Sequence, residues 1–166
     1  MARLIVFGGL PGTGKSTISR RLARALPAAW LRIDAIEQAL RRRRPELRDL
    51  RDTGYQIAAA VAESNLMAGV SVIADSVNPV RETRDMWAAT AHAARADLLE
   101  VWVTCSDQAK HRRRVEHREP DIAGLNLPDW SATATRQFQN WPSATLKLDT
   151  AHVTPDEAVE AILSRF

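Results

Sequence analysis

Residues 9–16 form a phosphate-binding loop of the pattern G-x-x-x-x-G-K-S, and it directly follows the short apolar run of residues 4–7. Glycines free the backbone to surround an anion with its N–H groups, and a helix after the loop adds its positive N-terminal end. In this motif Lys15 reaches the β- and γ-phosphates of a nucleotide, and the Ser16 hydroxyl holds a magnesium ion. The alternative is a glycine-rich turn without a ligand. The predicted nucleotide contacts are Gly9, Leu10, Pro11, Gly12, Thr13, Gly14, Lys15, Ser16 and Thr17.

The length and composition of the chain indicate a soluble globular protein. Its 166 residues, of which 45% are hydrophobic and 26% charged, suit one domain over residues 1–166. The chain starts in its first strand and has no apolar stretch near the ~20 residues of a membrane span, so we expect a cytoplasmic protein. The net charge of +3, carried mostly by arginine, permits a polyanionic partner without requiring one. Cys105 is the single cysteine, and we interpret it as structural.

Strands and helices are expected to alternate along the chain. Apolar runs predict strands at residues 4–7, 29–33, 70–74, 98–103 and 145–148. Helical spacing of apolar residues predicts helices at residues 16–26, 35–44, 54–68, 81–94, 108–118, 131–140 and 155–163. This alternation predicts an α/β fold with a parallel sheet that is covered by helices on both faces.

Two aspartates follow predicted strands and should lie at the ligand-binding edge of the sheet. Asp75 comes after the apolar run 72–74 and has the form of a Walker B acid, which holds magnesium directly or through water. Asp34 ends the second strand. Ligands of parallel sheets bind outside the carboxyl ends of the strands, so both acids should flank the phosphate loop. The alternative for Asp34 is a cap on the helix that begins at Ala35, and one residue can do both.

Arginines on the helix at 108–118 are candidates for contacts with the transferring phosphate. Arg114 and Arg118 lie four residues apart and share one helix face. The irregular stretch that follows suggests a lid at approximately residues 112–130, and arginines on a lid can close over phosphates and exclude water. A solvated basic face is the alternative. Arg136, on the next predicted helix, can also reach inward.

The loop and helix after Asp75 supply candidates for an acceptor pocket. Asn78 and Arg81 are expected to line it, with Arg84 one helical turn further on. Three tryptophans are candidate walls, although residues of this size more often pack in a core: Trp87, Trp130 and Trp141.

The chain resembles small P-loop kinases of the nucleoside-monophosphate-kinase-like group. The resemblance rests on residues 9–17, 31–34, 72–79 and 111–118. Within that group the chain is most similar to predicted kinases described as AAA-type ATP-binding proteins. It is more loosely similar to chloramphenicol phosphotransferase, gluconate kinase and polynucleotide 5′-kinase domains. The resemblance implies ATP and Mg²⁺ as cosubstrates, a hydroxyl acceptor near Asp34, and arginines on a lid.

The resemblance also implies a three-layer P-loop fold whose five-stranded parallel sheet has the order 2-3-1-4-5. Because neighbouring strands lie ~4.8 Å apart, Asp75 would be one strand from the phosphate loop and Asp34 two. In that position Asp75 can bind the magnesium ion together with Ser16. Asp34 lies where it can orient an acceptor hydroxyl and accept its proton.

Three functions are compatible with these residues. The leading hypothesis is an ATP-dependent kinase, a monomer or a homodimer, that phosphorylates a hydroxyl of a small metabolite or antibiotic. A 5′-hydroxyl nucleic-acid kinase would use the arginine excess. Such enzymes commonly place an arginine three residues after the acceptor aspartate, however, and here that residue is Glu37. The third function is a nucleotide-dependent switch or hydrolase without an acceptor. Against it, Asp75 does not begin the D-x-x-G pattern that switch proteins have after this strand.

Overall fold

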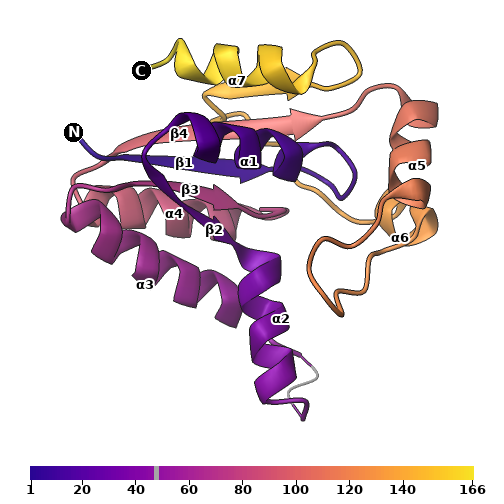
Figure 1. The fold of residues 1–166 in the computed structure, drawn as a ribbon, viewed down its shortest axis with the longest axis horizontal. Helices are drawn as coiled ribbons and strands as arrows, with labels where there is room; N and C mark the ends of the chain where they lie inside the picture. The colour runs from indigo at the N-terminus through magenta and orange to yellow at the C-terminus, as the bar shows by residue number, and fades with distance from the viewer. Residues whose placement is uncertain (47–48) are drawn as a thin grey trace.

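The computed structural model describes residues 1–46 and 49–166 and is centred on one five-stranded parallel sheet. The strand order, β2-β3-β1-β4-β5, confirms the order that the resemblance implies (Figure 1). The strands are β1 (Arg3–Gly8), β2 (Ala28–Arg32), β3 (Ser71–Asp75), β4 (Asp97–Thr104) and β5 (Leu146–Asp149). Each differs from its predicted range by only a residue or two at either end.

The central strand β1 is buried because sheet neighbours cover both of its edges and helices cover both of its faces. Leu4 pairs with Val72 of β3 and with Leu98 of β4, so its ladder is continuous on both sides. Leu4, Ile5, Val6 and Phe7 are all 0% exposed. A near-continuous apolar run is typical of such a strand, since side chains on both faces are removed from water.

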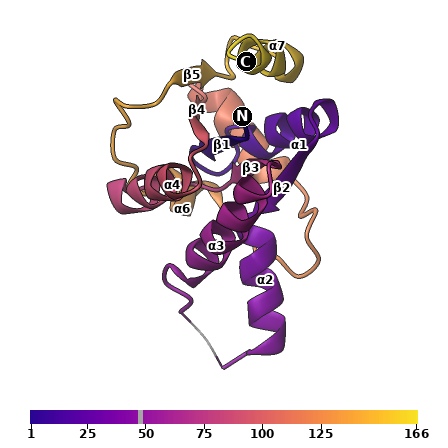
Figure 2. The ribbon, with the colours of Figure 1, turned by 90° about the vertical axis from the view of Figure 1, so that its left-hand side faces the viewer.

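Alternate residues of the sheet face two separate cores. Ile5 and Phe7 pack with Ile18 and Leu22 of α1 and with Ile162 of α7. Figure 2 shows α1 and α7 on one side of the sheet and α3 and α4 on the other. The second core joins side chains from β1 and β3 to α3 and α4; its members are Leu4, Val6, Ile33, Ala58, Ala62, Leu66, Val72, Ala74, Trp87, Ala91 and Trp141.

The helices begin and end close to their predicted positions, with one exception. Those that cover the sheet are α1 (Lys15–Ala25), α3 (Thr53–Met67), α4 (Arg81–Ala93) and α7 (Pro155–Leu163). Those near its carboxyl edge are α2 (Ile33–Arg43), α5 (Gln108–His117) and α6 (Trp130–Ala134). Thr154 and Glu157 form a capping box ahead of α7, and Pro155 takes the first helical position.

The predicted helix over residues 131–140 is wrong, because α6 ends at Ala134. The backbone beyond it bonds to another part of the chain instead of to itself. The carbonyl oxygens of Gln139 and Asn140 accept hydrogen bonds from the Arg84 guanidinium at 2.6 and 2.8 Å. The N–H of Gln139 donates to the carbonyl of Pro79 at 2.8 Å. Tertiary hydrogen bonds therefore override the local helical preference of this segment.

The strands point toward α5 and α6, whereas both chain termini lie at the opposite side of the molecule (Figure 1). The phosphate loop after β1, the start of α2 after β2 and the loop after β3 therefore meet at one edge. Within the described ranges, no helix is both long and apolar enough to cross a membrane.

Candidate active site

The phosphate loop connects β1 to α1 in a conformation that requires glycine at specific positions. Gly12 has a φ of +78°, and a Cβ built there would lie 2.5 Å from Cγ2 of Val115 on α5. A Cβ on Gly9 would lie 2.2 Å from the carbonyl oxygen of Val103. A side chain at either position would collide with packed atoms, so these glycines let the loop lie close to β4 and α5.

Two side chains from distant elements hold this loop in place, and neither was predicted from the sequence. Nε2 of His111 on α5 lies 2.7 Å from the carbonyl oxygen of Pro11, which requires the ring to donate from Nε2. The hydroxyl of Thr150, just after β5, donates to the carbonyl of Thr13 at 2.7 Å. Both side chains are buried, so the loop is fixed before a ligand binds.

Lys15 and Asp75 form a buried pair of opposite charges below the loop. Their exposed fractions are 7% and 4%. Burial lowers the pKa of Lys15, while the carboxylates of Asp75 and Asp34 oppose that shift. Burial likewise raises the pKa of Asp75, and Lys15 and the hydroxyl of Ser16 oppose it. Oδ2 of Asp75 also accepts a hydrogen bond from Ser19 at 3.0 Å, which fixes the carboxylate toward the start of α1.

The residues around Ser16 fit a magnesium ion that is bound together with a nucleotide. A hydroxyl and a carboxylate are hard oxygen donors, and magnesium in such sites takes one or two protein ligands, with waters and phosphate oxygens completing its coordination. Among residues 1–46 and 49–166, no group of three or more His, Cys, Asp or Glu side chains forms a metal site by itself. Ser16 and Asp75 therefore form a partial set of ligands that nucleotide phosphates would complete.

Asp34 lies in the first turn of α2, two positions further into the helix than the cap position that the sequence suggested. β2 ends at Arg32 and α2 begins immediately at Ile33, so the N-cap is Arg32. The alternative that Asp34 caps the helix is therefore wrong. A carboxylate in the first turn is still favoured by the helix dipole. Asp34 lines the cleft, and its charge acts on the pKa of Lys15, which places the two groups in one electrostatic cluster.

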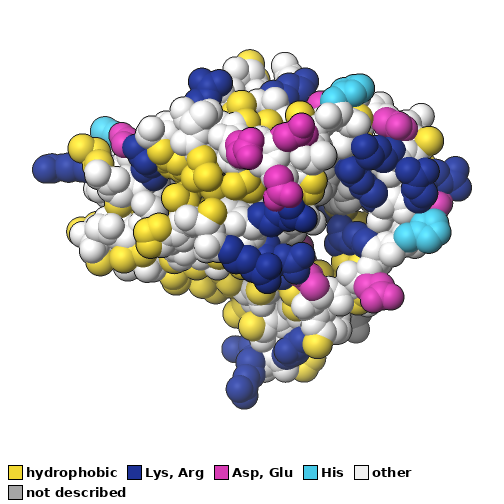
Figure 3. Space-filling model, turned by 45° about the horizontal axis from the view of Figure 1, so that its top comes forward, with side chains coloured by type: hydrophobic (Ala, Val, Ile, Leu, Met, Phe, Trp, Pro, Cys, Tyr) yellow, Lys and Arg dark blue, Asp and Glu magenta, His cyan; other side chains and the backbone are white. Residues whose placement is uncertain are grey.

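These elements enclose one cleft of about 870 Å³ at the carboxyl edge of the sheet. Figure 3 shows Lys and Arg side chains gathered around a hollow on this face. The basic residues that line the cleft are Lys15, Arg20, Arg32, Arg41, Arg113, Arg114, Arg118 and Arg136. Its acidic residues are Asp34, Glu37, Glu119 and Asp121. The excess of positive charge suits a ligand that carries phosphates.

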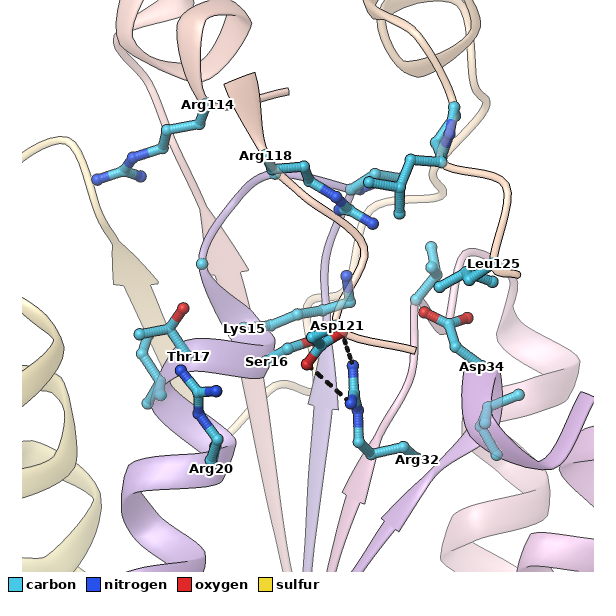
Figure 4. A pocket seen from close by; sticks show the side chains of 18 of the residues that line it. Lys15, Ser16, Thr17, Arg20, Arg32, Asp34, Arg114, Arg118, Asp121 and Leu125 are labelled. Atoms are coloured by element: carbon cyan, nitrogen blue, oxygen red, sulfur yellow. Dashed lines mark hydrogen bonds and ion pairs between the residues drawn. The ribbon is translucent and has the colours of Figure 1, made fainter. Parts of the chain in front are cut away.

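Arg114 and Arg118, the two arginines that the sequence assigns to a lid, point in different directions within this cleft (Figure 4). Nη1 and Nη2 of Arg114 donate to the hydroxyl and the carbonyl of Thr150 at 2.8 and 3.2 Å, on the β5 side of the phosphate loop. Arg118 points toward Lys15. Burial lowers the pKa of Arg118, and Asp34 gives the largest opposing effect. Arg118 therefore lies between the phosphate loop and Asp34. Arg114 instead holds Thr150, which in turn bonds to the loop at Thr13.

Arg136 also lines the cleft, although the segment that carries it is not helical. It lies close enough to Lys15 and Glu37 to affect the pKa of both. Neither Arg136 nor Arg118 forms an ion pair with an acid in the part of the chain that the structure describes. Both guanidinium groups thus remain available to a ligand.

Asn78 and Arg81 do not line the cleft, contrary to the sequence-based prediction. Asn78 is 0% exposed; its amide donates to the Phe7 carbonyl at 2.8 Å and accepts from Nε1 of Trp87 at 3.1 Å. Arg81 is on the surface and pairs with Asp85 at 3.2 Å. Arg84 lies buried against the carbonyls of residues 139 and 140. Asn78 therefore joins α4 to β1, and Arg84 joins α4 to the segment after α6.

The tryptophans also have structural positions. Trp87 and Trp141 are 0% and 2% exposed and belong to the core under α3 and α4. Trp130 contacts the ring of His111 edge-on, with ring centroids 5.3 Å apart. Burial of large apolar surface accounts for Trp87 and Trp141, and the contact with His111 accounts for Trp130, better than a role as pocket walls.

A second hollow of about 360 Å³ continues from the main cleft between α2 and α3. Four side chains line both spaces: Glu37, Arg41, Tyr55 and Arg136. Burial raises the pKa of Glu37. The guanidinium of Arg41, whose Nη2 lies 3.1 Å from Oε2 of Glu37, opposes this increase. This hollow lies next to Asp34 and away from the β5 side. It is a polar extension of the main cleft.

Asp149, at the end of β5, accepts a hydrogen bond from Ser106 after β4 and so connects the ends of these strands beside the phosphate loop. Its ionisation should contribute to the stability of the protein in acid. Burial alone would raise the pKa of Asp149, but N–H groups of Ser106 and Ala151 at 2.9 and 3.0 Å outweigh burial and hold the pKa at about 2. The folded pKa is thus below the unfolded value of about 3.9, so the stabilisation is complete above that value and disappears as the pH falls through about 2.

We therefore expect Asp149→Asn to reduce the loss of stability between about pH 4 and pH 2. At neutral pH the cost should be less than about 1 kcal/mol, because solvent screens this partly exposed carboxylate. Urea unfolding of both proteins across that pH range measures the difference. If the slope of stability against pH is the same in the variant, the pKa of Asp149 is not lowered in the folded state.

The sheet order, the glycine loop between β1 and α1 and the buried acid at the end of β3 define the fold of small P-loop kinases. The sequence matches the AAA_33 family, an AAA domain, over residues 4–140, and the chain belongs to this family. It is 34% identical over 105 residues to an adenylyl-sulfate kinase of Chloroflexus aurantiacus (strain ATCC 29364 / DSM 637 / Y-400-fl). That match covers 60% of this chain and 54% of the relative, so the chain spans about half the length of the curated relative it matches.

Solved structures share the fold over nearly the whole chain. The APS kinase of Mycobacterium tuberculosis in complex with AMPPNP and APS superposes with a TM-score of 0.71 at 19% identity, covering 98% of this chain and 96% of that one. A gluconokinase from Sinorhizobium meliloti 1021 gives a TM-score of 0.64 at 20% identity, covering 98% and 92%. At these identities the likeness shows the fold of the chain.

Proposed function

We propose that this protein is an ATP-dependent kinase that transfers the γ-phosphate of ATP to a hydroxyl of a small molecule. The observation that carries the proposal is the position of Asp34, which shares one cleft with Lys15 and the phosphate loop. In this arrangement the chain is one P-loop domain over residues 1–166, and approximately residues 112–130 act as its lid. Residues 9–17 would hold the phosphates of ATP.

The proposed reaction is an in-line transfer in which Asp34 accepts the proton of the acceptor hydroxyl. The hydroxyl oxygen bonds to the γ-phosphorus, the bond from that phosphorus to the bridging oxygen breaks, and ADP leaves with the electron pair. Lys15 and Arg118 would offset the negative charge of the transferring group. Ser16 and Asp75 would hold Mg²⁺, which supplies further neutralisation of the phosphate oxygens when bound.

A small acceptor fits the hollow beside Asp34 better than a polymer does. Its volume of about 360 Å³ is at the lower end of the range of small-molecule pockets, which is about 300–1,000 Å³. The hydrogen-bonding groups of Glu37, Arg41, Tyr55 and Arg136 suit a polar acceptor. The relative named adenylyl-sulfate kinase makes adenylyl sulfate one specific acceptor to test.

Transfer of label from [γ-³²P]ATP to separate pools of metabolites, antibiotics, adenylyl sulfate and 5′-hydroxyl oligonucleotides tests the proposal. We expect label in a small-molecule product, and no product after chelation of magnesium with EDTA. Restoring activity with excess Mg²⁺ is the control for chelation. Label only in the oligonucleotide would support the nucleic-acid kinase instead. Rapid release of inorganic phosphate that no acceptor stimulates would support a hydrolase.

A further inference from the structure

The cleft contains an internal oxyanion, because Arg32 at the end of β2 holds the carboxylate of Asp121. Nη1 and Nη2 of Arg32 donate to Oδ2 and Oδ1 of Asp121 at 2.9 and 3.0 Å, so the two groups meet as a bidentate fork. Figure 4 shows this pair beside Lys15 and Ser16. A carboxylate of the chain thus lies next to the residues that we expect to bind phosphates.

Arg32 has the properties of a fixed binding residue. Its side chain is 15% exposed, and its Cζ lies 5.1 Å from the ring centroid of Trp30. Nε of Arg32 is buried, has no hydrogen-bond partner among residues 1–46 and 49–166, and lies 3.8 Å from Oδ2 of Asp75. The guanidinium is therefore oriented by its surroundings, and its two terminal nitrogens face the cleft. A cation this far removed from water requires anions beside it, and Asp75 and Asp121 supply them.

Asp121 has the properties of a replaceable partner. Its side chain is 51% exposed and belongs to the irregular segment between α5 and α6. That segment has a second attachment, because Arg42 of α2 donates a hydrogen bond to the carbonyl of Ala123. Release of Asp121 from Arg32 would therefore leave the segment connected to α2.

We propose that Arg32 is an oxyanion-binding residue of the transfer site, and that Asp121 occupies its fork until a phosphate group of a substrate takes its place. This inference rests on the proposed function, since it requires phosphates in the cleft. The planar fork that binds two carboxylate oxygens binds two oxygens of a tetrahedral phosphate equally well. The oxyanion can be the γ-phosphate of the donor or an anionic group of the acceptor, and the experiment separates these sources.

Asp121 should then act as a competitor that weakens substrate binding. Removing its carboxylate should free the fork and increase the affinity for the displacing ligand by about fivefold, the size expected of a partly exposed ion pair. If Asp121 instead only holds the lid in a binding conformation, the same substitution should weaken binding. The sign of the change therefore decides between the two roles.

Isothermal titration calorimetry of Mg·AMPPNP and Mg·ADP with Asp121→Ala tests this inference. Tighter binding of AMPPNP with unchanged binding of ADP supports the γ-phosphate as the ligand of Arg32. A gain only for inorganic sulfate, titrated into the complex with Mg·AMPPNP, supports an anionic group of the acceptor. Glu119→Ala is the matched control, since Glu119 lines the same cleft without an ion pair among the described residues.

Equal or weaker binding of both AMPPNP and sulfate to Asp121→Ala would overturn the inference. So would the same gain in Glu119→Ala, because it would reflect net charge alone. A double variant with Arg32→Lys keeps a positive charge near Asp75 but has no fork, and it should lose the gain. Failure of the unmodified protein to bind AMPPNP would contradict the proposed function itself, and this inference with it.

Discussion

Asp34→Asn is expected to reduce the turnover of phosphate transfer by about 10²- to 10⁴-fold, the range for loss of a general base. The amide has nearly the same shape as the carboxylate but does not accept the proton of the acceptor hydroxyl. The nucleotide site on the loop 9–17 should remain intact, so the affinity for Mg·ATP should change little. Steady-state transfer assays, combined with calorimetric titration of AMPPNP, separate these two effects.

Asp156→Asn is the matched control for this substitution. Asp156 occupies the second position of α7, as Asp34 does in α2, so both carboxylates interact similarly with a helix dipole. Asp156 lies on the surface and pairs with Arg21, away from the cleft. We expect the control to keep full transfer activity. Equal activity in Asp34→Asn and Asp156→Asn would show that Asp34 has no part in proton transfer.

Asn78→Ala is expected to lower the free energy of unfolding by about 2–4 kcal/mol, because it leaves buried groups without partners. The Phe7 carbonyl would lose its donor, and Nε1 of Trp87 would lose its acceptor. Asn78 also has a φ of +48°, a conformation that asparagine tolerates better than alanine does. Urea unfolding followed by tryptophan fluorescence and circular dichroism measures the change.

Two controls separate the hydrogen bonds from the backbone strain. Asn78→Gly removes the side chain but tolerates the positive φ, so its loss of stability isolates the buried hydrogen bonds. Arg95→Ala places alanine at a φ of +53° on the surface, where the strain acts without buried partners. A loss in Asn78→Ala no larger than that in Arg95→Ala would contradict a structural role for the Asn78 amide.

The fold was largely predictable because its signals are local. The buried runs at Leu4–Phe7 and Val72–Ala74 and the glycine loop indicate strands and a strand-to-helix turn without tertiary information. The helix predicted at 131–140 failed because Arg84, far away in the sequence, takes the carbonyls of residues 139 and 140. No local pattern indicates such a contact. The boundary at Asp34 shifted because α2 follows β2 without a loop.

The candidate site was predictable where a motif specifies it and not where packing does. Lys15, Ser16, Asp34 and Asp75 follow from the loop and the strand ends, and all lie together at one edge. The pairing of Arg32 with Asp121 depends on how the segment between α5 and α6 crosses the cleft. Asn78 was assigned to a pocket because the chain direction after β3 does not reveal which side chains turn inward.

A structure of the protein with Mg²⁺, AMPPNP and the acceptor found by the transfer screen tests the two-substrate site most directly. We expect the γ-phosphate to lie against Lys15, between Ser16 and Asp34. The acceptor hydroxyl should lie about 2.6–3.2 Å from the Asp34 carboxylate, in line with the bond that breaks. An acceptor hydroxyl bound away from Asp34, or phosphates outside the loop 9–17, would contradict the account.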